Sequence, residues 1–179
     1  MNREICFFDY KQCFEYYKKR IINIRQAKIR GERIVAKPVL LLAIIDGIES
    51  GVYTLNRFVI DEWLERHYMM LMSKYAKPSQ FENLTGIDKP FWHLESDGFW
   101  HLICHGEKPT KERTPSKFWL IENIDHARFD DELWLLLQNR EWRHIVRDFI
   151  IEHKLTDETW FGRSVAEGLS AIMAMMIVA

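Results

Sequence analysis

Residues 36–51, AKPVLLLAIIDGIESG, predict a helix that is apolar on nearly all sides. Pro38 stands where a first helical turn tolerates proline, every residue from there to Ile45 is apolar, and the element is expected to end near Gly51. A helix without a polar face has to be covered by other elements in every direction. We therefore expect this segment to lie in the centre of the fold.

Length and composition indicate one globular unit around that helix. With 179 residues, of which 47% are hydrophobic, the chain can bury one substantial core. Its seven tryptophans and eleven phenylalanines argue against intrinsic disorder. We expect a single domain over residues 1–160. The apolar run 169–179 at the end of the last segment, 161–179, falls well short of the ~20 residues that span a bilayer. We therefore expect a helix, an oligomer contact or the cut edge of a longer protein there, and no membrane anchor.

The N-terminus and the cysteines favour a cytoplasmic location. The first residues, MNREICFFDYKQ, place acids and aromatic residues where a secretory signal needs an uninterrupted apolar stretch. Cys6, Cys13 and Cys104 are an odd number without CxxC spacing, which disfavours a disulfide framework and a cysteine-rich zinc site. We expect reduced, mostly buried thiols.

The net charge of -1 identifies no partner, but the charges are unevenly distributed. Nine Lys or Arg residues fall between residues 11 and 37, against the acids Glu15 and Glu32. Lys11, Lys18 and Arg25 are spaced seven apart and form a basic stripe. The ordinary explanation of such a stripe is a solvated helix face.

Apolar spacing predicts further helices along the chain. Alternating steps of three and four from residue 7 to residue 24 indicate an amphipathic helix, which Gly31 is expected to end. Asn56 is a good N-cap for a helix that continues to residue 75. Residues 130–155 predict two helices that meet near Asn139.

Residues 88–102, DKPFWHLESDGFWHL, predict a β-hairpin with Asp97 and Gly98 as its two-residue turn. Both faces of such a hairpin are largely apolar, so it is expected to lie between other elements. The sequence FWLIE at 118–122 can add a third strand. The expected fold is mostly helical α+β, a helical bundle with a small antiparallel hairpin or three-stranded sheet. The aromatic and aliphatic residues expected in its core are Trp92, Leu94, Phe99, Trp100 and Leu102.

No catalytic constellation is evident in the sequence. The patterns GxxxxGK[ST], GxGxxG and GxSxG are absent. Asp125-His126, Asn139 and His153 follow the order of an HNH nuclease only loosely, because Asn139 falls between two predicted helices instead of in a hairpin. Glu152 and Lys154 mimic a nuclease Glu-x-Lys pair, but residues two apart on a helix face different ways.

Histidines near Cys104 are the one candidate zinc site. In the predicted hairpin register, however, His93 and His101 point to opposite faces, and His105 completes no ligand pair. We therefore expect no catalytic residue, no metal ion and no cofactor in this chain.

Three separated blocks of the sequence resemble a known family. They are AKPVLLLAIIDGIESG, then KPFWHLESDGFWHL about fifty residues later, then DDELWLLLQNRE. Together they resemble the N-terminal DNA-reading domain of HNH-type restriction endonucleases, which is related to the sulfur-binding domain that recognises phosphorothioate-modified DNA. The likeness covers roughly residues 5–155. It implies a helical domain with a small sheet that docks on duplex DNA and leaves cleavage to a separate HNH nuclease domain or subunit.

The resemblance also implies site residues. In the family, a basic residue before the first proline meets the modified phosphate, and here that pair is Lys37-Pro38. A Tyr-Pro pair lines a shallow apolar cavity, and here Lys89-Pro90 keeps only the proline. His93 stands where a small residue helps to form the cavity, and Ala36 stands where a histidine is frequent.

The chemistry of these positions suits a DNA backbone. A cation at Lys37 lies beside the positive end of a helix, where backbone amides also face a phosphate. The basic stripe and the loop at 106–117 could neutralise more phosphates, with an affinity that falls steeply in salt. The further cations expected to contact DNA are Lys11, Lys18, Arg25, Lys108, Lys111, Arg113 and Lys117.

Two other classes of function remain open from the sequence alone. In a winged helix-turn-helix regulator or a helical interaction module, residues 38–75 would form the helix-turn-helix and the hairpin would form the wing. The tip ESDG at residues 95–98 is acidic, which disfavours a wing on DNA. An enzyme with unrecognised chemistry is the third class, and the oligomeric state is open.

Overall fold

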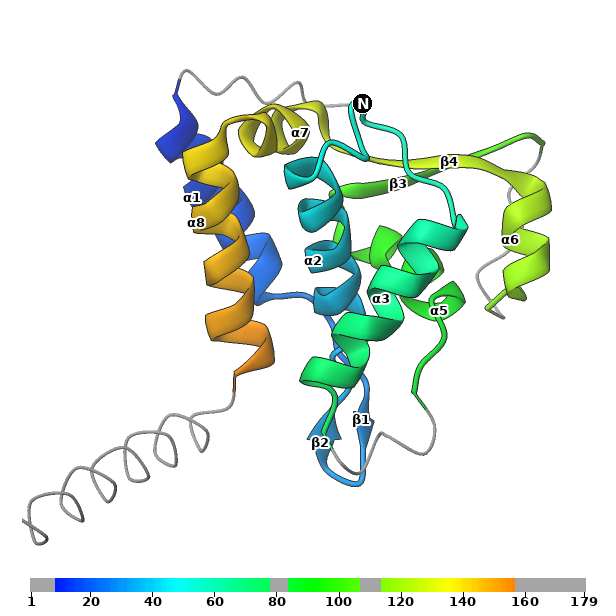
Figure 1. Ribbon diagram of the computed structural model, residues 1–179. Helices are drawn as coiled ribbons and strands as arrows, with labels where there is room; N and C mark the ends of the chain where they lie inside the picture. The colour runs from blue at the N-terminus through cyan, green and yellow to red at the C-terminus, as the bar shows by residue number, and fades with distance from the viewer. Residues whose placement is uncertain (1–8, 78–83, 107–113, 157–179) are drawn as a thin grey trace, which may run out of the picture.

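The central element of the fold is helix α2 (Ala36–Glu49), as its apolar sequence predicts (Figure 1). The computed structural model describes residues 9–77, 84–106 and 114–156. Within α2, Val39, Leu40, Leu42, Ala43 and Ile44 have 0% of their surface exposed. Pro38 occupies the first turn, and the helix ends at Ser50. Complete burial of one helix requires that several neighbours pack against it.

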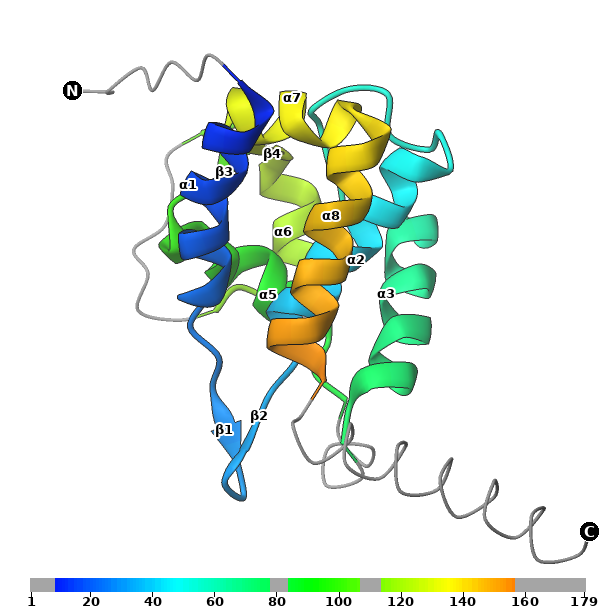
Figure 2. The same cartoon turned by 90° about the vertical axis from the view of Figure 1, so that its left-hand side faces the viewer.

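Four helices form the bundle around α2, and Figure 2 shows α3 and α8 beside it. They are α1 (Tyr10–Ile22), α3 (Glu62–Tyr75), α7 (Asp131–Gln138) and α8 (Arg140–Ile150), of which α3, α7 and α8 contact α2 directly. α1 packs on α7 and α8. Side chains cap the helix starts, because Asp9, Asp61 and Asn139 each accept a hydrogen bond from a first-turn amide. The predicted break at Asn139 is confirmed. A short π-helical turn, η2 (Ile151–Leu155), extends α8.

The hairpin predicted at residues 88–102 is wrong in its first half. Residues 88–97 form α5 (Asp88–His93) and a 3-10 turn, η1 (Leu94–Asp97), which packs with α5 beside α2. Gly98, with φ 83°, ends η1 in the left-handed conformation, a position that suits a helix C-cap as well as a hairpin turn. Short apolar runs are ambiguous between helix and strand, and here the helix buries Phe91 and Leu94 on the same side.

The second half of that segment does form a strand, β3 (Trp100–Cys104). It pairs antiparallel with β4 (Ile124–Phe129), so that Trp100 lies opposite Phe129. The strand predicted at 118–122 is also wrong. Those residues belong to α6 (Lys117–Asn123). Ser116 caps this helix, because its side chain accepts a hydrogen bond from the backbone N–H of Trp119.

Two predicted helix ends are wrong as well. Asn56 does not cap α3, because its side chain bonds both backbone groups of Phe129 at 2.9 Å and so ties the loop before α3 to β4. Gly31 does not end α1, because a separate two-stranded hairpin of β1 (Lys28–Ile29) and β2 (Glu32–Arg33) surrounds it.

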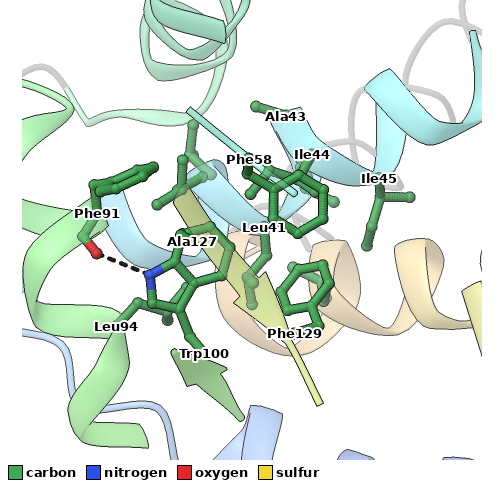
Figure 3. Packing of buried hydrophobic residues seen from close by; sticks show 14 of the residues in the cluster. Leu41, Ala43, Ile44, Ile45, Phe58, Phe91, Leu94, Trp100, Ala127 and Phe129 are labelled. Atoms are coloured by element: carbon green, nitrogen blue, oxygen red, sulfur yellow. Dashed lines mark hydrogen bonds between the residues drawn. The ribbon is translucent and has the colours of Figure 1, made fainter. Parts of the chain in front are cut away.

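An aromatic cluster joins the sheet to α2 and α5 (Figure 3). Phe58 stacks on Trp100 with ring centroids 5.6 Å apart, and Phe129 packs on both rings. The indole N–H of Trp100 donates to the carbonyl of Phe91 at 2.9 Å, so the buried polar group is satisfied. The residues predicted as core from this region are all buried: Trp92, Leu94, Phe99, Trp100 and Leu102.

Two of the three cysteines lie in the part of the chain that the structure describes. Cys13 is a buried thiol whose pKa is raised to about 12 by burial, and Cys104 is a half-buried thiol. Cys6 and the apolar segment 161–179 lie outside the described residues. Of the helices that the structure describes, none is both long and apolar enough to cross a membrane.

A buried arginine fastens α8 to the rest of the bundle. Arg143, only 9% exposed, donates to the carbonyl oxygen of Leu137 at 2.7 Å and to the carboxylate of Glu49 at 2.6 Å. It therefore links α8 with the end of α7 and the end of α2. The guanidinium also lowers the pKa of Glu49 by hydrogen bonding to its carboxylate.

We predict that Arg143→Met lowers the free energy of unfolding by about 2–3 kcal/mol, because it leaves a buried carbonyl without its donor. Arg140→Met is the matched control, since Arg140 is 79% exposed and lies 3.7 Å from the same Glu49. It should change stability by less than about 0.5 kcal/mol. Urea denaturation followed by tryptophan fluorescence measures both, and equal losses would contradict the assigned role of Arg143.

Candidate nucleic-acid interface

Lys37, the predicted phosphate contact at the start of α2, forms an ion pair inside the fold. Its Nζ donates to Oδ2 of Asp97 at 2.6 Å, and the side chains are 12% and 3% exposed. The other carboxylate oxygen of Asp97 accepts the backbone N–H of Arg25 at 3.1 Å. Asp97 thus joins the start of α2, the end of η1 and the loop after α1. Because Asp97 balances its charge, Lys37 acts here mainly as a structural link.

Other cations surround this pair. A Cβ on Gly98 would lie 2.9 Å from Nη1 of Arg20, which places that guanidinium directly over the turn after Asp97. Lys154, at the end of η2, donates to the carbonyls of Ile22 at 2.7 Å and Ile24 at 3.3 Å. Its pKa is lowered by burial and by the charge of Arg33, while Asp97 opposes that effect.

We call this set the Asp97 cluster. It consists of the Asp97 carboxylate, the cations Arg20, Arg33, Lys37 and Lys154, and the exposed Arg25, whose backbone N–H bonds Asp97. The members come from α1, the following loop, β2, α2, η1 and η2, so only the folded chain brings them together. Cations gathered in one region favour a polyanionic partner, because such a partner relieves their mutual repulsion.

The second predicted proline site, at the start of α5, presents two side chains to solvent. Lys89 and His93 are exposed, whereas Pro90 is buried, as are Pro38 and Ala36 of the first site. Nε2 of His93 lies 2.5 Å from Oγ1 of Thr114. α5 packs directly against α2, so the two segments that carry the predicted residues are neighbours. Lys89 is therefore an exposed cation on a helix that neighbours α2.

The predicted basic stripe does not act as a unit. Lys11 is exposed near the start of α1, but Lys18 is half-buried, 3.6 Å from a carboxylate oxygen of Glu15 and over the ring of Phe149. Arg25 lies beyond the helix end and belongs to the Asp97 cluster.

The predicted basic loop is mostly outside the part of the chain that the structure describes. This applies to Lys108, Lys111 and Arg113. Lys117 is described, and it pairs with Glu65 at 2.6 Å, which fastens α6 to α3.

The nuclease-like positions have structural partners in the fold. Asp125 bonds Arg57 at 2.8 Å and His126 at 2.6 Å, and these contacts lower its pKa. Asn139 caps α8, and Nδ1 of His153 lies 3.1 Å from the carbonyl of Phe149. In the described ranges, no group of three or more His, Cys, Asp or Glu side chains is arranged to hold a metal ion.

A cavity of about 160 Å³ opens beside α6, lined by six apolar residues together with the polar His105 and Asp125. Its lining contains no Lys or Arg among the described residues, so it offers no lysine or arginine cation to a phosphate. The lining residues are Val59, Ile60, Phe91, His105, Leu120, Ile121, Ile124 and Asp125.

Sequence reasoning missed the basic hairpin β1–β2 and the contribution of Lys154. The segment KIRGER carries Lys28, Arg30 and Arg33, all exposed. The dipeptide Arg30-Gly31 could have indicated a two-residue turn, since glycine suits the second position of such turns. Gly31 equally suits a helix end, which is the interpretation that the structure overturns.

The chain is similar to known proteins in both sequence and fold. A family model described as "ScoMcrA-like, DNA sulfur-binding domain" matches residues 15–159. Among solved structures, the sulfur binding domain of ScoMcrA complexed with phosphorothioated DNA is similar, with a TM-score of 0.58 and 21% sequence identity. The match covers 77% of this chain and 86% of that chain. None of the curated proteins matches.

We predict that Lys37→Met lowers the free energy of unfolding by about 3 kcal/mol, because it leaves the buried carboxylate of Asp97 without the cation that bonds it directly. Adding Asp97→Asn should recover about 1–2 kcal/mol, since the amide oxygen can still accept the N–H of Arg25. Lys89→Met, at an exposed site, is the control and should be nearly neutral. Chemical denaturation of the four proteins measures these differences, and no recovery in the double variant would show that the ion pair is not the cause.

Proposed function

The chain belongs to the family of ScoMcrA-like DNA sulfur-binding domains, and from this premise we propose that it is a DNA-recognition module of a restriction or defence system. The family resemblance inferred from three sequence blocks is thereby confirmed. The module binds duplex DNA with the end of the molecule that carries the Asp97 cluster and the start of α2. Cleavage belongs to a nuclease domain or subunit of the HNH type, and the site of action is the cytoplasm.

The observation that carries this proposal is the Asp97 cluster within the matched region. Four cations from four parts of the chain gather there around one carboxylate, and the exposed Arg25 bonds that carboxylate through its backbone N–H. Phosphates on a duplex are regularly spaced negative charges, and a protein that neutralises them gains affinity by releasing counterions. The N-terminus of α2 adds backbone amides, because its N-cap, Val35, supplies no capping side chain.

Phosphorothioate DNA keeps the backbone charge and exchanges one oxygen for a more polarisable sulfur. A site that prefers it needs apolar surface beside the cation. The buried positions of Pro38 and Pro90 limit that surface, and His93 adds a polar group. We therefore propose binding to plain and modified duplexes, with a smaller preference for sulfur than an open apolar cavity would give.

The winged helix-turn-helix alternative is not supported by the fold. Its recognition helix would have to enter a DNA groove. α2 is buried along its length and α3 carries Tyr68 and Met72 into the core at 0% exposure, so neither can leave the bundle. The predicted acidic wing at residues 95–98 is part of η1 and Gly98.

We predict that the protein retards a duplex at low salt, and that the logarithm of the association constant falls linearly with the logarithm of the salt concentration. Arg25→Ala and Lys89→Ala should each weaken binding about fivefold and lower that slope by about 1. Arg66→Ala is the control, since Arg66 is 76% exposed on α3.

Fluorescence anisotropy with three duplexes of one sequence measures the binding. One duplex is plain, one carries methylated cytosine and one carries a single phosphorothioate linkage. Absence of binding to all three at low salt would rule out the proposed function.

A further inference from the structure

The hairpin β1–β2 projects beyond the helical body, next to the start of α2 (Figures 1 and 2). Its strands pair Lys28 with Arg33 and Ile29 with Glu32, and Arg30 and Gly31 form the tip. Three cations and one acid thus occupy six residues, and all three cations are exposed. β2 runs through residues 34 and 35 into α2, so the hairpin is continuous with the Asp97 cluster, of which Arg33 is a member.

The tip has a conformation that arginine rarely adopts. Arg30 has φ 51° and Gly31 has φ 83°, the signs that a type I′ turn requires at both central residues. Within the described residues, Arg30 is the one non-glycine residue with positive φ. Asparagine is the favoured residue at this position, so the turn itself does not call for arginine. A disfavoured conformation that keeps a cation at the tip of the hairpin suggests a role for the charge.

The size of the hairpin selects one of the two grooves of DNA. A two-stranded ribbon, with strands about 4.8 Å apart, fits the major groove of about 12 Å, whereas the minor groove is only about 6 Å wide. Arg30 at the tip follows Lys28 by two residue steps, which amounts to about 7 Å at about 3.3 Å per residue. That length is close to the major-groove depth of about 8.5 Å. A cation at the tip would thus approach the base edges while Lys28 and Arg33 stay at the level of the phosphates.

We propose that the β1–β2 hairpin enters the major groove of duplex DNA, with Arg30 at the base edges and Lys28 and Arg33 at the flanking phosphates. This inference rests on the proposed function and adds which groove is occupied. Arginine at the base edges favours guanine, whose O6 and N7 accept from one guanidinium. The hairpin therefore adds a preference for guanine next to the backbone contact made by the Asp97 cluster.

The test uses a variant that keeps the fold of the hairpin. Lys28→Thr with Arg30→Asn removes two charges, while threonine suits a strand and Asn-Gly is a preferred type I′ turn. The matched control, Arg66→Gln with Arg140→Gln, also removes two exposed charges, from α3 and from the first residue of α8. The melting temperatures of all three proteins establish that each is folded.

Binding is measured by anisotropy on plain and phosphorothioated duplexes with guanines on both strands, and guanine N7 atoms are probed with dimethyl sulfate in the complex. We expect the wild type and the control to protect specific N7 atoms. The hairpin variant should lose that protection and should bind more weakly, by up to about tenfold. Three results would overturn the inference. If the variant binds and protects as the wild type does, or if the wild type binds without protecting any N7, the hairpin is not in the major groove and the proposed function stands. If the wild type binds no duplex, both fail together.

Discussion

The burial of α2 on every side is the constraint on which the rest of the structure depends. Its apolar surface is covered by α3, α7, α8 and the α5–η1 segment, so its faces are unavailable to a partner. The exposed cations lie on the elements around the end at which the chain enters the helix, where Lys37 is half-buried. The β1–β2 hairpin, the loop after α1 and the end of η2 all meet there, and they carry the cations that the proposed function uses.

The Lys37–Asp97 pair shows how this end is both built and charged. A buried carboxylate needs a counter-charge and hydrogen bonds, and Lys37 and the amide of Arg25 supply them. Because Asp97 neutralises Lys37, the attraction for a polyanion comes from the cations around the pair, above all Arg20, Arg25 and Arg33. A position that the family resemblance assigns to phosphate binding thus serves here to hold α2 against η1.

Much of the fold could be predicted from the sequence, because burial leaves a periodic pattern. The central helix, the break at Asn139 and the buried Trp100 follow from such patterns. The glycines are an ambiguous local signal, since a glycine with positive φ fits both a helix end and a hairpin turn. The sequence therefore predicts the wrong element at two of them. The sequence predicts Gly98 in a hairpin turn, whereas it caps η1, and it predicts Gly31 at a helix end, whereas it lies in a hairpin. The Asp97 cluster could not be predicted, because it joins residues up to 134 apart, from Arg20 to Lys154, and no local pattern records such contacts.

The claim that duplex DNA binds at the hairpin end of α2 is tested most directly by mapping backbone amide chemical shifts during titration with a duplex. The account predicts that the perturbed amides gather in residues 25–37 and at the start of α5. It also predicts that the perturbations weaken as salt is raised. Perturbations gathered instead on α6 and the walls of its apolar cavity, with residues 25–37 unchanged, would contradict it.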